Sequence, residues 1–237
     1  MDFLEKDNWW WRGRRKIFLK ILGKDFGKKK GRKILDVGCG TGIMLSHLAR
    51  FGEVVGVDIA KEAIGFCQKK GLEKVYLGDA QKLPFGSKKF DLVTAFDTLE
   101  HVKDDKKALK EFYRVLQGGG MILLTVPAHP VIWSSHDDRN QHYRRYTKDD
   151  FRSKVLEAGF KIKRITYMNS LLFLPAFTFR FLTGVFNRSG VFKAHTDFHR
   201  MPWLINDILT WAFGGEAVIL QNFNLPIGIT LLIEAKK

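Results

Sequence analysis

Three glycines and one acidic residue have the spacing in this sequence that points most directly to chemistry. Gly38, Gly40 and Gly42 follow the apolar run 34–37 and precede a helical pattern, and Asp58 ends the next apolar run. Glycines after a strand permit a tight turn and let a ligand lie against the backbone. A carboxylate at the end of the following strand can accept hydrogen bonds from ribose hydroxyls. Together they predict that an adenosine-containing molecule binds at the carboxyl edge of a sheet.

Two other nucleotide sites fit this pattern less well. A dinucleotide fingerprint, G-x-G-x-x-G/A, needs a third small residue so that the helix packs closely on the strand. Counted from Gly38 that position is Ile43, and counted from Gly40 it is Leu45, and both side chains are large. A P-loop needs Gly-Lys followed by Ser or Thr, which the sequence does not contain. The pattern therefore favours a nucleoside without a pyrophosphate.

The elements that must position these residues alternate between strand and helix. Apolar runs predict strands at 34–37, 54–58, 75–77, 90–96 and 121–126, and helical spacing predicts helices at 43–50, 61–70 and 103–116. This alternation predicts a parallel sheet covered on both faces. Right-handed crossovers make that an α/β, doubly wound fold.

The two ends of the chain have different patterns. The predicted elements are a basic, aromatic helix at 9–22 that Gly23 interrupts, a long loop at 127–146, a helix from Thr147 to Gly159, apolar helices at 171–186 and 203–213, and strands at 161–168 and 227–235. We therefore expect an N-terminal arm at 1–32, a cofactor-binding core at 33–160, and the end of the sheet at 161–237. In that last part the inserted apolar helices would form a substrate lid or cap.

Composition limits the class of protein. The chain has 237 residues, of which 45% are hydrophobic, so a disordered protein is excluded. With only Cys39 and Cys67, and no apolar signal-peptide pattern after Met1, a reducing cytoplasmic location is expected. The net charge is +15; residues 1–33 hold 12 Lys and Arg against 4 Asp and Glu, and residues 160–237 hold 9 against 4. Such basic ends suit nucleic acid, an anionic lipid surface, an anionic substrate, or simple solubility.

The order of these motifs resembles that of class I S-adenosylmethionine-dependent methyltransferases, most closely the small-molecule branch that includes ubiquinone and menaquinone methyltransferases. The resemblance covers roughly residues 33–127. The segments that carry it are 34–42, 54–58, 78–80 with 83–85, 90–102 and 116–124. It implies a Rossmann-like, mostly parallel seven-stranded sheet with a helical cap.

The resemblance also implies a cofactor, S-adenosyl-L-methionine, and the residues that bind it. Gly38 and Gly40 would lie along its methionine part, Asp58 would hold the ribose, Asp79 and the Ala80 amide would meet the adenine, and the Phe96 carbonyl would receive the ammonium. A subgroup of these proteins has a similar basic arm, whose Arg14 would pair with the cofactor carboxylate. The full set of implied cofactor residues is Arg14, Asp36, Gly38, Gly40, Gly42, Asp58, Ile59, Asp79, Ala80 and Phe96. Cys39 is expected to be a small filler of the turn rather than a nucleophile.

The segment 136–146 follows the fifth predicted strand, at the edge where substrates lie in open α/β sheets. Three interpretations stay open for it. It binds substrate, with Arg144 or Arg145 holding an anionic group; it is a lid held by internal ion pairs; or it contributes to a metal site. The first interpretation takes its substrate-binding residues from His136, Arg144, Arg145 and Tyr146. The metal site would use His129, His136, Asp137 and His142, although their spacing matches no known metal motif, and we expect no metal.

Two histidines are candidate general bases. His101 lies just after the fourth predicted strand, near the expected methyl group, although it could simply begin the following helix. His142 is the second candidate. An imidazole suits this role because its ordinary pKa lies near neutrality.

We predict an S-adenosylmethionine-dependent methyltransferase that acts on a small, hydrophobic or amphipathic acceptor by in-line methyl transfer. Peripheral contact with a membrane is a further expectation, and the oligomeric state is left open. The alternatives are a nucleic-acid-binding or RNA-modifying protein of the same fold, or a nicotinamide-dependent oxidoreductase. The sequence 96–99 lacks the Asn/Asp-Pro-Pro-Tyr/Phe pattern of amino methyltransferases that act on nucleobases or glutamine, which disfavours a nucleic-acid substrate.

Overall fold

The structure is a computed structural model of the 237-residue chain. It describes residues 6–27, 31–171, 173–174, 177–178 and 202–237. Most of the apolar helix predicted at 171–186, including Phe179 and Phe181, lies outside the described residues.

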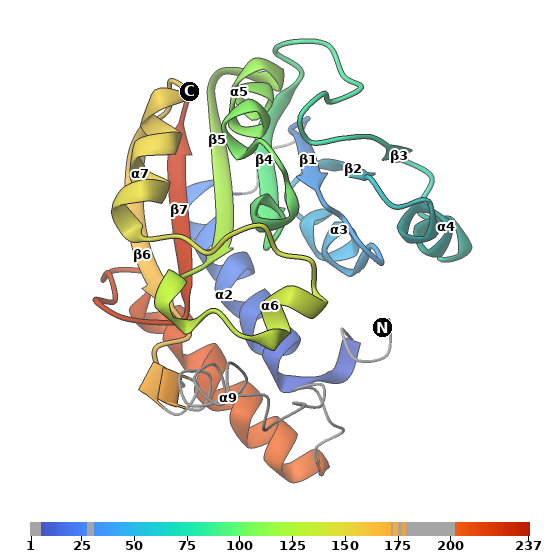
Figure 1. Cartoon of the computed structure of the whole chain (residues 1–237). Coiled ribbons are helices and arrows are strands. Elements are labelled where there is room, and N and C mark those ends of the chain that lie inside the picture. Colours follow the sequence, from blue (N-terminus) through green and yellow to red (C-terminus); the bar gives the residue numbers. More distant parts are fainter. Residues whose placement is uncertain (1–5, 28–30, 172, 175–176, 179–201) are drawn as a thin grey trace.

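A single seven-stranded sheet organises the chain (Figure 1). The strands are β1 (Lys33–Val37), β2 (Glu53–Asp58), β3 (Val75–Leu77), β4 (Phe90–Phe96), β5 (Leu116–Pro127), β6 (Lys161–Met168) and β7 (Thr230–Lys236). Their order across the sheet is β3-β2-β1-β4-β5-β7-β6. The first five run parallel, and β7 lies antiparallel between β5 and β6. The predicted doubly wound, mostly parallel fold is confirmed.

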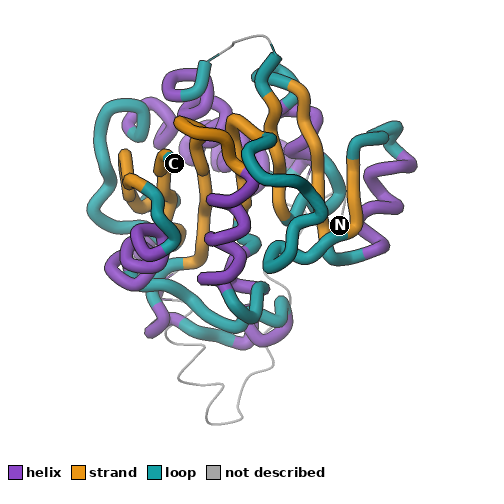
Figure 2. Tube along the Cα trace, turned by 90° about the horizontal axis from the view of Figure 1, so that it is seen from above, coloured by secondary structure: helices purple, strands orange, loops and turns teal. Residues whose placement is uncertain are grey.

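Helices lie on both sides of the strands (Figure 2). They are α2 (Trp9–Asp25), α3 (Ile43–Leu48), α4 (Lys61–Lys69), α5 (Asp105–Val115), α6 (Ser135–Arg139), α7 (Lys148–Glu157) and α9 (Trp203–Ile219), with 3-10 turns at Leu99–His101 and Pro130–Ile132. The side chains of α5 and α7 join one apolar cluster, and those of α2, α3 and α9 join another on the opposite face.

Strand β5 shows why the sheet is buried on both faces. Its residues Ile122 and Leu124 belong to the cluster with α5 and α7, whereas Met121 and Leu123 belong to the cluster with α2 and α9. Successive side chains of a strand point to opposite faces, so an unbroken apolar run requires cover on both.

The predicted N-terminal arm is part of this cover. Helix α2 buries Ile17, Phe18, Ile21 and Leu22 against the sheet. Gly23 does not interrupt it; the helix continues to Asp25, because burial of Leu22 and Phe26 on either side offsets the low helix propensity of glycine. The arm therefore contributes to the main core instead of lying on the surface.

Other predicted boundaries move by a few residues. β5 begins at Leu116 rather than Met121, because Phe90 already pairs with Leu116 across a bulge. The predicted loop 127–146 contains the short helix α6. Thr147 caps α7 as predicted, its side chain accepting from the Asp150 amide at 3.1 Å.

Candidate cofactor and acceptor site

The glycine-rich turn joins β1 to α3 and is held by the next strand. The amides of Gly38 and Cys39 donate to the Val57 carbonyl at 2.8 and 3.1 Å. Gly38 and Gly40 both have positive φ, at 73° and 53°, which glycine adopts without strain. A Cβ on Gly38 would lie 2.4 Å from Thr98 Oγ1, whereas one on Gly40 would meet no atom within 4 Å. The turn is thus packed on its Gly38 side and open at Gly40.

Asp58 ends β2 beside that open side. Its Oδ2 accepts from the Gly40 amide and its Oδ1 from the Ala60 amide, each at 2.9 Å. The residue is half-buried, and the following Ile59 is 71% exposed. A carboxylate offers about four lone-pair positions, so two remain for a ligand's hydroxyls. Asp58 is fixed by two backbone amides at the edge of the turn.

The Asp79 turn lies next to Asp58. The Gly78 amide donates to the Asp58 carbonyl at 2.9 Å, which ties the end of β3 to the end of β2. Asp79 is half-buried, and its Oδ1 accepts from the Gln81 amide at 2.8 Å, while Ala80 is buried. The structure therefore brings the predicted ribose and adenine residues to one sheet edge.

Asp36 lies beneath the turn rather than at its surface. The side chain is buried, and the Thr94 hydroxyl donates to its Oδ1 at 2.6 Å. Burial raises the pKa of Asp36 to about 7, and the nearby charge of Asp58 adds to the shift. Burial also raises the pKa of Cys39, and a protonated thiol is a weak nucleophile.

The end of β4 carries a residue that sequence reasoning missed. Asp97 has φ 51°, and its Oδ2 lies 2.6 Å from Arg14 Nη2. Arg14 is buried on α2 and also donates to Thr125 Oγ1 at 3.2 Å. The structure thus brings Arg14 to the carboxyl edge of the sheet, where its immediate partner is Asp97. The sequence carried no local signal for this pair, because the burial of Arg14 becomes evident only in the fold.

Phe96 lies beside this pair. Its ring stacks on Phe18 of α2, with centroids 4.1 Å apart and planes 7° apart. The Phe96 carbonyl accepts from Thr98 Oγ1 at 3.4 Å, a long hydrogen bond.

The two candidate bases lie together. The rings of His101 and His142 are 4.7 Å apart and perpendicular, at 85°. His101 is exposed as a residue, yet desolvation of its ring, together with the His142 ring, lowers its pKa. Glu100 precedes them and is 1% exposed, and burial, reinforced by the charge of Asp97, raises its pKa well above the usual range. Glu100 was not predicted from the sequence, where it is one acid among many.

Asp137 is the buried partner shared by side chains of the segment 136–146. Its Oδ1 lies 2.9 Å from His142 Nδ1 and 2.8 Å from Arg145 Nε, and its Oδ2 accepts from the Ser134 amide at 2.9 Å. Burial alone would raise the pKa of Asp137, but the hydrogen bond from His142 and the charge of Arg145 outweigh it and lower the pKa. With Nδ1 of His142 engaged, its Nε2 remains for other contacts.

The other predicted substrate residues have internal partners too. Arg145 is buried and also donates to the Ala128 carbonyl at 3.0 Å. Arg144 Nη1 lies 3.0 Å from Asp105 Oδ2, and the buried Tyr146 donates to the same oxygen at 2.8 Å. His136 is half-buried on α6, its ring centroid 6.4 Å from that of His142. These are the contacts of a segment held by internal ion pairs.

The metal set weighed from the sequence is not assembled in the described residues. His129 Nε2 lies 2.9 Å from the Gly228 carbonyl, and its ring stacks on Tyr167 with centroids 5.3 Å apart. The ring centroids of His136 and His142 are 6.4 Å apart, and neither His129 nor His136 belongs to a possible metal-binding group among the described residues.

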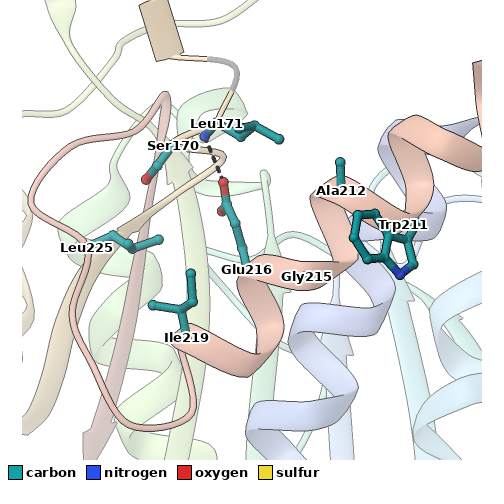
Figure 3. Close-up of a pocket in the computed structure, with 8 residues that line it drawn as sticks. All are labelled: Ser170, Leu171, Trp211, Ala212, Gly215, Glu216, Ile219 and Leu225. Atoms are coloured by element: carbon teal, nitrogen blue, oxygen red, sulfur yellow. Dashed lines mark hydrogen bonds between the residues drawn. The ribbon is translucent and has the colours of Figure 1, made fainter.

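An apolar pocket lies apart from the glycine-rich turn, between the end of β6 and α9 (Figure 3). Its volume is about 520 Å³. Glu216 points from α9 toward the β6 end, where its two oxygens accept from the Asn169 and Leu171 amides at 2.7 and 2.9 Å. Leu171, Trp211 and Ile219 line the rest of it.

Comparison with known proteins identifies the core. Residues 35–124 match the family described as "Methyltransferase domain". This part of the chain is similar to methyltransferase domains. The match spans β1 to β5 with the glycine-rich turn, Asp58 and Asp79, and it confirms the predicted class I resemblance for this domain. It favours neither the oxidoreductase nor the nucleic-acid-binding alternative.

Curated relatives of the methyltransferase domain are demethylmenaquinone methyltransferases. One from Staphylococcus aureus (strain MRSA252) is 41% identical over 125 residues, which cover 49% of this chain and 52% of the relative. One from strain JH9 is 39% identical over the same coverage. The chain therefore spans about half the length of the curated relatives it matches.

Solved structures share the fold over a longer stretch. A protein from Bacillus halodurans C-125 aligns with a TM-score of 0.62 and 20% identity, covering 93% of this chain and 98% of its own. An S-adenosylmethionine-dependent methyltransferase from Archaeoglobus fulgidus aligns with a TM-score of 0.60 and 22% identity, covering 99% of this chain and 98% of its own. At such identities the likeness establishes the fold, including the strands beyond residue 124.

Proposed function

We propose that this chain is an S-adenosylmethionine-dependent methyltransferase that transfers a methyl group to a small, hydrophobic or amphipathic acceptor. The observation that carries the proposal is the open backbone at Gly40, bonded to the fixed carboxylate of Asp58, within a methyltransferase domain. Gly71 and Gly119 also combine a positive φ with open space, so the distinguishing feature of Gly40 is its hydrogen bond to the carboxylate that ends the next strand.

The residues at this edge fit the cofactor. Gly40 leaves room for a group against the backbone, and Asp58 keeps two lone-pair positions for ribose hydroxyls. Asp79 and the Ala80 amide would meet the adenine, and the Phe96 carbonyl would receive the ammonium. Arg14 is already paired with Asp97, so we propose that it positions that carboxylate and the end of β4, and that any contact with the cofactor carboxylate is shared with Asp97.

The bound cofactor would supply an electrophilic methyl group on a sulfonium; the chain supplies alignment and a place for the proton. Orientation alone can lower a barrier by about 7–11 kcal/mol in well-aligned cases. His142 would accept the acceptor's proton at Nε2, because Asp137 holds Nδ1 at 2.9 Å and so fixes the tautomer. The His101 ring is perpendicular to the His142 ring and would form another wall of the proposed acceptor site.

For the acceptor, we propose a molecule with a quinone-like or otherwise apolar body. Two observations support this: the curated relatives are demethylmenaquinone methyltransferases, and Arg144 and Arg145 are engaged with Asp105 and Asp137. Because these two cations already have internal partners, they leave little charge with which to hold an anionic substrate.

We also propose contact with an anionic membrane surface through α9. Its exposed apolar side chains include Trp203 and Trp211, at 76% and 78% exposure. Lys16, Lys20 and Arg50 gather beside Gly214 of the same helix, so apolar and basic groups lie together as in interfacial helices. None of the helices in the described parts of the chain combines the length and apolar content that crossing a bilayer needs.

Two experiments test these proposals. Transfer of a labelled methyl group from S-adenosylmethionine to a panel of quinols and other apolar hydroxyl compounds is expected to succeed, and transfer only to RNA would refute the proposed acceptor class. Sedimentation with anionic vesicles should retain the chain, and the double variant Trp203→Ser, Trp211→Ser should remain in solution. Equal sedimentation of the chain and the variant would argue against the α9 contact.

A further inference from the structure

Glu100, His101 and His142 form a cluster with the composition of a metal site. Each offers one ligand atom, and these atoms all lie within 4.8 Å of one another; no other such group of three occurs among the residues that the structure describes. We infer that this cluster binds one first-row divalent metal ion, with Zn²⁺ as the ion that its chemistry suits best.

One oxygen of the buried Glu100 carboxyl group lacks a hydrogen-bond partner. Glu100 is 1% exposed, and its Oε2 accepts no hydrogen bond. An unpartnered polar atom inside a protein costs free energy. No ion pair of Glu100 occurs among the described residues; of the two nearby arginines, Arg14 is paired with Asp97 and Arg145 with Asp137. A cation between Glu100 and the two imidazoles would supply the missing partner.

One nitrogen of the His142 ring is engaged, which leaves the other for a metal ion. Nδ1 of His142 lies 2.9 Å from Asp137 Oδ1, and the His101 ring lies beside it, with ring centroids 4.7 Å apart. Metal-binding histidines characteristically have their second nitrogen held by a carboxylate or a backbone carbonyl in this way. Asp137, itself fixed by Arg145 and Ser134, would be the outer partner that orients His142.

The donor set selects the ion. Two nitrogens and one carboxylate oxygen form a set found in catalytic zinc sites, whereas Ca²⁺ and Mg²⁺ prefer oxygen ligands alone. Zinc ligands lie about 2.0–2.2 Å from the ion and so roughly 3.5 Å from one another. Since His101 is an exposed residue, a rotation of its side chain can close the remaining gap.

Three protein ligands leave one coordination position open. An acceptor hydroxyl bound there would have its pKa lowered and would release its proton to solvent water, so the ion would replace His142 as the activating group. This consequence rests on the proposed methyltransferase function, whereas metal binding itself does not.

The test is metal titration of the full chain after treatment with a chelator. Calorimetry with Zn²⁺ and visible absorption with Co²⁺ should show one ion per chain. His101→Gln and Glu100→Gln should each weaken binding at least tenfold. His47→Gln on α3 and His129→Gln should bind as the unsubstituted chain does. Thermal melting of the metal-free variants checks that they fold, and exposed His101 is the safest substitution for this purpose.

Absence of a stoichiometric site, or a site unaffected by His101→Gln and Glu100→Gln, would overturn the inference. Loss of binding in His129→Gln would do the same, because it would favour a different ligand set. The metal-free chain is also titrated with S-adenosylmethionine. A chain that binds this cofactor but no metal refutes only the metal site, and one that binds the metal but no cofactor refutes only the proposed function.

Discussion

The glycine-rich turn and the segment 128–147 lie at the same sheet edge but are built in opposite ways. At the turn, the backbone is left open for the proposed cofactor: Gly40 has open space beside it, and backbone amides hold Asp58. In the segment, side chains meet one another: the buried Asp137 binds His142 and Arg145, and Asp105 binds Arg144. The proposed cofactor side therefore depends on keeping space empty, whereas the proposed acceptor side depends on pairing buried charges.

If this contrast is correct, the largest loss of stability follows from removing Asp137. Asp137→Ala should lower the free energy of unfolding by about 3–5 kcal/mol, because it leaves the buried Arg145 without its carboxylate. Urea denaturation measures the change. Asp138→Ala is the matched control, because the carboxylate of Asp138 is exposed. Among the contacts described, it accepts only from Trp133 Nε1. Equal losses in both variants would show that the segment is not held by Asp137.

On the cofactor side, the pH dependence of stability tests the buried Asp36. In the folded chain its pKa is about 7, against 3.8 for an ordinary aspartate. The folded state therefore keeps this proton longer, and the contribution of Asp36 to stability falls as the pH rises from about 4 to about 7. The full effect is up to about 4 kcal/mol.

Asp36→Asn removes that titration while its Oδ1 can still accept from Thr94. The unfolding free energy of the variant, relative to the unsubstituted chain, should rise between pH 4 and pH 7 and stay level above. Any cost of burying the new amide is the same at every pH, so the slope is the readout. A constant difference across this range would mean that Asp36 is ionised in the fold.

The Arg14–Asp97 pair, which ties α2 to the end of β4, should have an intermediate effect. Arg14→Met removes a buried guanidinium that lies 2.6 Å from Asp97, and a loss of about 1.5–3 kcal/mol is expected. Arg12→Met removes a pair with Asp207 whose side chains are 36% and 53% exposed, and less than about 1 kcal/mol should be lost. Thermal melting distinguishes the two, and a larger effect at Arg12 would contradict the assignment.

The smallest effect on stability and a marked effect on binding are expected at Gly40. Gly40→Ala places a side chain at φ 53°, which costs roughly 1–2 kcal/mol, and it fills the space assigned to the cofactor. We expect at least tenfold weaker binding of S-adenosylmethionine. Gly65→Ala on α4 is the control, because it has equally open surroundings without a positive φ. Unchanged binding in Gly40→Ala would place the cofactor elsewhere.

The same contrast explains which features the sequence predicts. Glycine spacing and apolar runs encode backbone geometry directly, so the strands, the turn and the position of Asp58 follow from local patterns. The partners of charged side chains depend on tertiary contacts. Arg14 and Asp97 are 83 positions apart in the sequence, and nothing local pairs them. Arg145 likewise looks like a substrate ligand until Asp137 is found beneath it.

Helix α2 shows a second limit. Its three consecutive tryptophans and its arginines suggest a surface arm, yet Ile17 and Ile21 lie in the main core. The apolar residues between the charged ones indicated that one face of α2 is buried. Only the packing of α2 against β1 and β5 shows which of its charged side chains is buried with that face. Nothing in the sequence marked Glu100 as the buried carboxylate between two histidines.

The most direct test of the central claim is calorimetric titration of the chain with S-adenosylmethionine, beside Asp58→Ala and the control Glu62→Ala, which removes an exposed carboxylate four residues away. We predict one binding site, at least tenfold weaker binding in Asp58→Ala, and unchanged binding in the control. Absence of binding in the unsubstituted chain, or equal affinity in all three proteins, would contradict the account.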